Sequence, residues 1–249
     1  MCTLSFVPTA DRYVVGMNRD ELLTRPPARP PERFEGAEMS VISPSEPAGG
    51  TWIACNSRGT LLALLNSTDC QGKTPPEKTQ TRGAVVPQLI WRAHSSGVQS
   101  GFRHLRLTGM LPFRLVGIFR DEAAVISWHW DGVGIYRTDL PWKRQHWFSS
   151  SLSDALAAKQ RGSVCEKAAC SSDPRRSPWL RLLHASHDPS PGAFSICVHR
   201  RDAASVSYTE VSCRADRITM DYFPGHPCTQ SALLSTDALT RPTTTCSAG

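Results

Sequence analysis

The sequence predicts a mixed α and β domain whose strands are mostly joined as antiparallel hairpins. Short runs of β-prone residues alternate with turn-forming residues, which is typical of such pairs. Three other segments, 83–93, 155–169 and 178–186, are predicted as helices. A chain of 249 residues can bury one sizeable core, and nothing divides it convincingly in two. We therefore expect a single α+β domain over residues 1–223, followed by a disordered tail over residues 224–249 that is poor in apolar residues.

The first predicted hairpin places a cysteine beside a polar cluster. Residues 3–7 and 12–17 are β-prone, and the residues between them carry turn chemistry. Antiparallel pairing brings Cys2 opposite the run Asn18-Arg19-Asp20. Removal of Met1 would leave an α-amine with a pKa of roughly 8 beside the thiol, and such an amine can act as the general base. The alternatives are that position 2 is arbitrary and that the charged run is merely solvated.

Further hairpins follow along the chain. Residues 51–56 and 60–65 are apolar at most positions, as expected for a sheet covered on both faces. The Pro-rich stretch 26–47 predicts a long surface connection with at most one short strand near residues 39–42. That connection would serve as a pocket wall or as a wrap over a sheet edge. Later strands are predicted at 113–119, 123–130, 133–137, 145–150, 194–199, 205–211 and, at an edge, 217–223.

Ordered motifs in the first quarter of the chain resemble a known family. They are Met1-Cys2-Thr3, Asn18-Arg19-Asp20-Glu21 with Arg25-Pro26, Gly49-Gly50-Thr51-Trp52-Ile53, Asn56, Arg58-Gly59 and Ala63-Leu64-Leu65-Asn66. In this order they resemble the NRDE family, also called the transport and Golgi organization protein 2 family. That family is similar to N-terminal-nucleophile hydrolases of the choloylglycine hydrolase type. The resemblance implies a four-layer αββα sandwich of two mostly antiparallel sheets.

The resemblance also implies site residues. Cys2 would be the nucleophile, Asp20 would contact its amine, and Asn66 would donate to the developing oxyanion, although an Asn at a strand end usually just caps a turn. Arg19 would position substrate or buttress Asp20. The remaining residues expected at the substrate site are Asn18, Trp52 and Ser151.

Two positions depart from the pattern of those hydrolases. Met17 stands where they have an arginine, and Arg19, which follows, is expected to point to the other face of the strand. Ser151 stands where relatives commonly have an asparagine, and a hydroxyl reaches less far than an amide. The stretch 193–195 also lacks an arginine that some relatives carry.

Two functions remain open on this basis. The first is a cysteine N-terminal-nucleophile hydrolase that cleaves an amide or thioester bond of a small or lipid-like substrate and requires no cofactor. The second is a non-catalytic carrier of haem or lipid on the same fold, in keeping with the family's proposed links to haem trafficking and lipid homeostasis. The aromatic group Trp128-His129-Trp130 could contact haem, or could simply be core. A role in secretion rests on the family name alone.

The composition of the chain limits the binding partners and the cellular compartment that we expect for the protein. The net charge of +6 comes from scattered arginines without interleaved aromatics, so nucleic-acid binding is not expected. We expect a cytoplasmic protein with reduced thiols, because no run of eighteen apolar residues and no secretory segment is present. His184 and His187 lie three apart without a thiolate or carboxylate in register, so no metal site is expected. Oligomeric state is left open.

Overall fold

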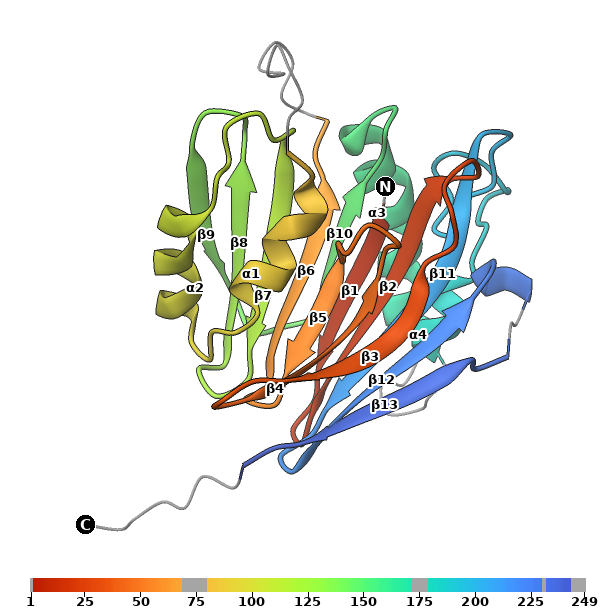
Figure 1. Cartoon of the computed structure of the whole chain (residues 1–249). Coiled ribbons are helices and arrows are strands. Elements are labelled where there is room, and N and C mark those ends of the chain that lie inside the picture. The colour runs from red at the N-terminus through yellow and green to blue at the C-terminus, as the bar shows by residue number, and fades with distance from the viewer. Residues whose placement is uncertain (1, 69–79, 172–178, 230–231, 243–249) are drawn as a thin grey trace.

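Two antiparallel sheets pack face to face, and helices cover their outer faces (Figure 1). This computed structural model describes residues 2–68, 80–171, 179–229 and 232–242. The first sheet has the strand order β10-β1-β2-β11-β12-β13, with β1 Cys2–Pro8, β2 Tyr13–Leu22, β10 Gln145–Ser149, β11 Ala203–Cys213, β12 Arg217–Pro224 and β13 Ser235–Thr240. The second has the order β3-β4-β5-β6-β7-β8-β9, with β3 Arg29–Glu35, β4 Ser40–Ser45, β5 Ile53–Asn56, β6 Thr60–Asn66, β7 Phe113–Phe119, β8 Ala124–Trp130 and β9 Ile135–Leu140.

Strand alternation builds the core between the two sheets. Successive side chains point to opposite faces of a strand, so Leu4 and Phe6 of β1 enter this core together with Val15 and Met17 of β2. Residues of β5 and β6 meet them from the second sheet. The alternate residues of β1 and β2 face outward, toward the helices.

The outer faces are covered by separate helix pairs. Helices α1 (Val85–Leu89) and α2 (Ser95–Gly101) pack their apolar residues onto the second sheet. Helices α3 (Asp154–Ser171) and α4 (Trp179–His184) cover the first sheet through a smaller apolar cluster. The order of layers is therefore helix, sheet, sheet, helix, and the expected four-layer αββα architecture is confirmed.

The register of the first hairpin agrees with the sequence prediction. Cys2 pairs with Arg19 and Thr3 with Asn18, so the thiol lies opposite the predicted polar run. On the other side of β1, Cys2 pairs with Ser149 of β10. The start of β1 is thus held between two strands near the end of the sheet.

The Pro-rich stretch contains two strands rather than one. β3 carries Pro30 and Pro31, yet it pairs with β4 at the edge of the second sheet. An edge strand tolerates proline because one row of its backbone groups needs no partner. The register also shifts between Arg29 and Glu32, which accommodates the two prolines.

Two other local predictions need correction. The segment 194–199 was expected to form a hairpin with β11, but it makes only isolated bridges, such as His199 with Ala204. Helix α2 was not predicted, because its sequence Ser-Ser-Gly-Val-Gln-Ser-Gly has little helix propensity. It is held in place by Val98, which is buried against the second sheet.

The expected disordered tail also needs correction. Strand β13 pairs with β12 over six residue positions, so β12 is not an edge strand. Leu239 is 1% exposed and belongs to the core between the sheets. The domain therefore extends at least to Arg241, whose guanidinium donates to the carbonyl of Arg58 in the second sheet's β5–β6 turn. Residues 243–249 lie outside the described residues.

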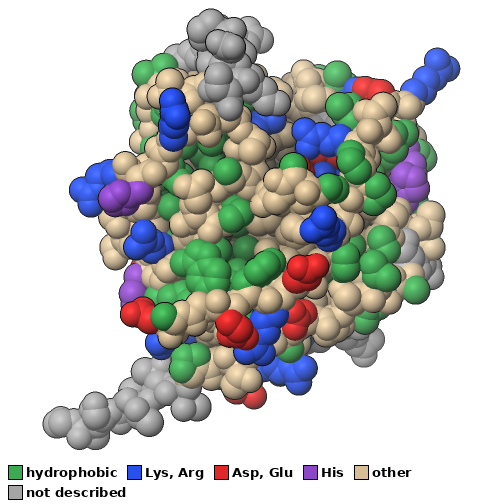
Figure 2. Space-filling view, in the orientation of Figure 1, with side chains coloured by type: hydrophobic (Ala, Val, Ile, Leu, Met, Phe, Trp, Pro, Cys, Tyr) green, Lys and Arg blue, Asp and Glu red, His purple; other side chains and the backbone are tan. Residues whose placement is uncertain are grey.

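The surface charge and the helices relate to the expectations about nucleic acid and about the membrane. On the face shown in Figure 2, the Lys and Arg side chains are scattered among polar and apolar ones and do not form a single patch. Among the helices of the described part of the chain, none combines the length and the hydropathy that a membrane crossing requires.

Candidate active site

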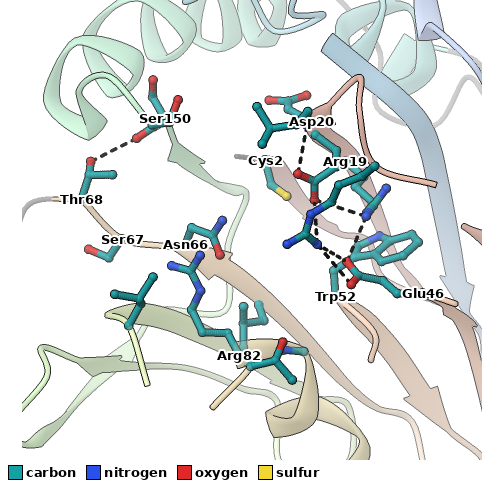
Figure 3. Close-up of a pocket in the computed structure, with 18 of the residues that line it drawn as sticks. Cys2, Arg19, Asp20, Glu46, Trp52, Asn66, Ser67, Thr68, Arg82 and Ser150 are labelled. Carbon is teal, nitrogen blue, oxygen red and sulfur yellow. Dashed lines mark hydrogen bonds and ion pairs between the residues drawn. The ribbon is translucent and has the colours of Figure 1, made fainter. Parts of the chain in front are cut away.

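A cavity of about 510 Å³ opens at one end of the two sheets, where β1, β2 and β6 all contribute walls. Cys2 and Asp20 lie on one wall, and Asn66 and Arg82 lie on the opposite wall (Figure 3). The cavity also reaches the Pro-rich connection through Glu46. Six of the seven site residues expected from the sequence line this one cavity: Cys2, Arg19, Asp20, Trp52, Asn66 and Ser151.

The Cys2 thiol is buried at the inner end of the cavity. The residue is 6% exposed and joins the core between the sheets. Burial raises the pKa of the thiol, while the positive charge of the amino terminus and a hydrogen bond from the Asp20 backbone act to lower that pKa. The thiol is therefore mostly protonated at neutral pH, and a nearby base would be needed to generate the thiolate.

Asp20 is the buried carboxylate nearest to the start of β1. It is 1% exposed, and its Oδ1 accepts a hydrogen bond of 2.5 Å from Ser205 Oγ. Burial raises the pKa of this carboxyl, and the positive charge of Arg161 opposes that effect. A bulge in β11 next to Ser205 interrupts the ladder with β2 at this point, and bulges commonly re-aim side chains beside active sites.

Arg161 of helix α3 is a site residue that the sequence analysis missed. Its side chain is fully buried, and Nη1 lies 3.6 Å from Asp20 Oδ2. The same nitrogen donates to Thr3 Oγ1 at 2.9 Å and to the Cys2 carbonyl at 3.3 Å. One guanidinium thus fixes both the start of β1 and the Asp20 carboxylate. The available signal was an arginine on the apolar face of a helix, in register with the buried residues Ala157, Val164 and Cys165.

Arg19 lines the cavity with the other expected site residues, although its side chain was expected on the face of the strand opposite to that of Met17. Residues two apart share a face of a strand, so Arg19 faces the same side as Met17 and as its partner Cys2. Its Nη2 donates to Glu46 Oε1 at 2.9 Å and to Glu21 Oε2 at 3.2 Å, and its guanidinium lies 4.7 Å from the Trp52 ring centroid. Arg19 therefore ties the Pro-rich connection to the sheet.

Asn18 is not brought to the cavity. It lies on the opposite face of β2 and is fully buried under the helix layer. Its amide donates to the carbonyls of His184 and Ile196 at 2.8 and 3.0 Å, and its Oδ1 lies 3.0 Å from His184 Nδ1. The expected contact of Asn18 with substrate is thus inconsistent with its position, because strand alternation gives it a structural role.

The opposite wall presents polar groups to the cavity. Asn66 ends β6, and its side-chain amide makes no hydrogen bond with any residue in the described ranges. Arg82 donates to the Pro112 carbonyl at 3.0 Å, and burial lowers the pKa of its guanidinium. Ser151 also lines the cavity, but its hydroxyl accepts a hydrogen bond of 3.0 Å from Arg200.

The aromatic group at 128–130 lies elsewhere. Trp128 and Trp130 are buried between the second sheet and its covering helices, where their indole nitrogens donate to Gln99 and to the Met110 carbonyl. These tryptophans belong to the core and do not line the cavity. The proposed haem contact through them has no support in this arrangement.

The fold and the cavity together define an αββα protein with a cysteine at the start of its first strand. The chain belongs to the Transport and Golgi organisation 2 family, whose profile matches residues 1–167. That range contains every cavity residue named above, together with Arg161. A search of curated proteins gave no significant match.

Solved structures with a similar course of chain include a bile acid hydrolase and an acylase. A mutant conjugated bile acid hydrolase from Clostridium perfringens is 10% identical, with a TM-score of 0.46, and the alignment covers 97% of each chain. Penicillin V acylase from Agrobacterium tumefaciens is 9% identical, with a TM-score of 0.47, over 96% of this chain and 85% of that one.

Proposed function

We propose that the protein is a cysteine N-terminal-nucleophile hydrolase that cleaves an amide or thioester bond of a small or lipid-like substrate. The observation that carries this proposal is the position of Cys2, buried at the inner end of the cavity beside the Asp20 carboxylate. A thiol, an adjacent amine and an orienting carboxylate are sufficient for acyl transfer, so no cofactor is needed. We place the activity in the cytoplasm, where a nucleophilic thiol stays reduced.

The proposed reaction begins once Met1 has been removed. The α-amine of Cys2 takes the thiol proton, and Sγ attacks the carbonyl carbon of the substrate. The tetrahedral intermediate expels the amine or thiol leaving group, which takes the proton from the α-ammonium group. Water, deprotonated by the same α-amine, then attacks the thioester carbonyl. The carbon–sulfur bond breaks to release a carboxylic acid, and the Cys2 thiolate takes its proton back from the α-ammonium group. Asp20 would orient the amine and stabilise its ammonium form.

The opposite wall supplies a candidate oxyanion donor. The Asn66 amide faces the cavity and makes no hydrogen bond within the described part of the chain. Donors that stabilise a developing oxyanion contribute about 3 kcal/mol in other enzymes. We therefore expect Asn66→Ala to lower kcat by roughly 100-fold with a smaller effect on KM.

The cavity lining indicates the character of the substrate. Leu22, Leu64 and Leu111 contribute apolar surface, whereas Arg82 contributes positive charge. The charges of Arg19 and Arg25 are already balanced by Glu21 and Glu46. This combination suits an acyl chain or another apolar body that carries an anionic group.

The test combines the mature N-terminus with trapping of the acyl-enzyme. Intact mass spectrometry should show that Met1 is absent, and iodoacetamide at neutral pH should alkylate Cys2 before the other thiols. Exposure to thioester and amide substrates should add an acyl group to Cys2, and Cys2→Ala should abolish that adduct. Cys213→Ala, which changes a buried thiol remote from the cavity, serves as the matched control. Retention of Met1, or a Cys2 no more reactive than the other thiols, would refute the proposal.

The second candidate is a non-catalytic carrier of haem or lipid that uses the same cavity. It is favoured by Ser151, which stands where relatives commonly have an asparagine, because a hydroxyl reaches less far into the cavity than an amide does. Titration with haemin, followed by absorbance, separates the two candidates. Saturable binding that persists in Cys2→Ala, without acyl-enzyme formation in the wild type, supports the carrier. The absence of binding at micromolar haemin counts against a haem carrier.

A further inference from the structure

Four side chains of metal-binding types lie close together beside the first sheet, and none of them lines the cavity. His187 follows α4, Cys197 and His199 belong to the segment before β11, and Cys228 lies in the short helix η3 (Pro227–Thr229). One ligand atom from each of the four lies within 4.8 Å of every other. Cys197 and His199 are close in the sequence, whereas His187 and Cys228 are brought to them by the fold.

Hydrogen bonding does not account for this arrangement. His199 Nε2 lies 3.6 Å from Cys197 Sγ and 3.4 Å from Cys228 Sγ, so two sulfur atoms approach a single ring nitrogen. A neutral imidazole nitrogen can donate or accept only one such bond. His187 Nε2 is buried and has no hydrogen-bond partner among the described residues. The ring centroids of His187 and His199 are 4.8 Å apart, and the ligand atom of His187 lies within 4.8 Å of those of the other three residues.

We propose that these four residues bind a zinc ion. Zinc prefers a tetrahedron of thiolate and imidazole ligands, in which a sulfur and a nitrogen are separated by roughly 3.6 Å. Both sulfur–nitrogen distances at His199 are close to that separation. A shared cation would also satisfy the orphaned nitrogen of His187 and would hold the thiols as thiolates. With four protein ligands the site is closed, so its role is structural.

The zinc site would support the candidate active site through a series of hydrogen bonds that leads to β2. Val198, between two of the ligands, donates its N–H to Ser205 Oγ at 2.8 Å and accepts from the Ser205 N–H at 3.0 Å. Ser205 Oγ in turn donates to Asp20. The neighbouring Ile196 carbonyl accepts the hydrogen bond from Asn18. An ion that fixes residues 197–199 would therefore fix the partners of two polar residues at the end of β2.

The test measures metal in the purified full-length protein. Mass spectrometry of the metal content should give about one zinc per chain. After removal of zinc under reducing conditions, Co²⁺ should produce the intense visible bands of four-coordinate cobalt and a thiolate charge-transfer band. Cys228→Ser and His187→Ala should lower the affinity for Co²⁺ by roughly tenfold or more, and Zn²⁺ should displace the cobalt. Cys165→Ser and His94→Ala, which alter side chains outside the cluster, should bind as the wild type does.

Three further results would decide whether the four residues bind zinc. A zinc chelator should lower the Tm of the wild-type protein, because a metal that binds only the folded state stabilises it; this measurement holds even where a variant fails to fold. A Cys197–Cys228 disulfide in freshly isolated protein, together with no four-coordinate cobalt spectrum after reduction, would overturn the proposal. Wild-type cobalt affinity in Cys228→Ser would overturn it as well.

Discussion

Arg161 and Asp20 form an ion pair in which both side chains are completely buried, with Nη1 and Oδ2 3.6 Å apart. The arginine comes from helix α3 and the aspartate from β2, so the pair joins the outer helix layer to the strand that lies beside Cys2. Three further acceptors, Thr3 Oγ1 and the carbonyls of Cys2 and Ser149, share the same Nη1. The carboxylate is therefore kept next to the thiol by a contact made 141 positions later in the sequence.

Replacement of Arg161 by methionine should destabilise the protein strongly. The substitution leaves the Asp20 carboxylate buried without its cation, and removal of one partner from a buried pair costs about 3–5 kcal/mol. Urea unfolding at neutral pH measures this loss. Lys159→Met changes an exposed cation on the same helix and should alter the free energy of unfolding by less than about 0.5 kcal/mol. Equal effects of the two substitutions would contradict the role assigned to Arg161.

The destabilisation by Arg161→Met should also depend on pH. The charge of Arg161 lowers the pKa of Asp20, so its loss raises a native pKa that burial has already raised. A raised native pKa favours the folded state while the group is protonated, so the deficit is smallest below the unfolded pKa of about 4 and grows as pH rises through the native value. When Asp20→Asn/Arg161→Met is compared with Asp20→Asn alone, the loss of unfolding free energy caused by Arg161→Met should no longer depend on pH.

His184 should make the protein sensitive to acid. The ring is fully buried, with Nδ1 3.0 Å from Asn18 Oδ1 and Nε2 2.9 Å from Ser5 Oγ, and burial lowers its pKa to about 3. Because the native pKa lies below the unfolded one, stability is fully present above about pH 6.5 and falls by about 1.4 kcal/mol per pH unit below it. Between pH 6 and pH 4, His184→Gln should reduce the slope of unfolding free energy against pH by about 1.4 kcal/mol per pH unit, the contribution of roughly one proton. His104→Gln, at an exposed imidazole, should leave that slope unchanged.

The first hairpin and the place of Cys2 in it could be predicted because local patterns determine them, whereas Trp52, Asn66 and Ser151 were expected only from the family resemblance. The turn near residues 8–12 fixes the register, and the strand period of two fixes the faces, which together place Cys2 opposite Arg19. The same period should have shown that Arg19 shares the face of Met17 and that Asn18 does not. The faces of Arg19 and Asn18 are thus determined by the local sequence alone.

The remaining features depend on contacts between distant parts of the chain. Arg161 meets Asp20 only when α3 packs on the first sheet, and no spacing in the sequence specifies that contact. Strand β3 was missed because prolines count against strands, although the edge of a sheet tolerates them. Strand β13 has few apolar residues and is recognisable only from its pairing with β12.

Leu239→Ala tests whether strand β13 is part of the domain. This side chain is 1% exposed in the core between the sheets, and truncation of such a leucine costs about 2–5 kcal/mol. The neighbouring Thr240 is exposed, so Thr240→Ala should change stability by less than about 0.5 kcal/mol. Urea unfolding of both variants makes the comparison. An unchanged unfolding midpoint in Leu239→Ala would restore the prediction of a dispensable tail.

Gly83→Ala tests the rim of the cavity. A Cβ at Gly83 would lie 3.2 Å from the Cα of Gly50, and the Thr51 N–H already donates to the Gly83 carbonyl at 3.1 Å, so backbone presses on backbone at this point. Separation of the two segments should cost about 1–3 kcal/mol. Because Gly83 and Thr51 both line the cavity, the shift should also change the rate at which iodoacetamide alkylates Cys2. Gly97→Ala in helix α2 provides the control, because its Cβ would make an ordinary contact of 3.4 Å with Cβ of Arg92, which precedes the helix. Alanine should stabilise that helix by roughly 0.5–1 kcal/mol without altering alkylation of Cys2. An alkylation rate that is the same in both variants and in the wild type would show that the Gly50–Gly83 crossing does not control access to the thiol.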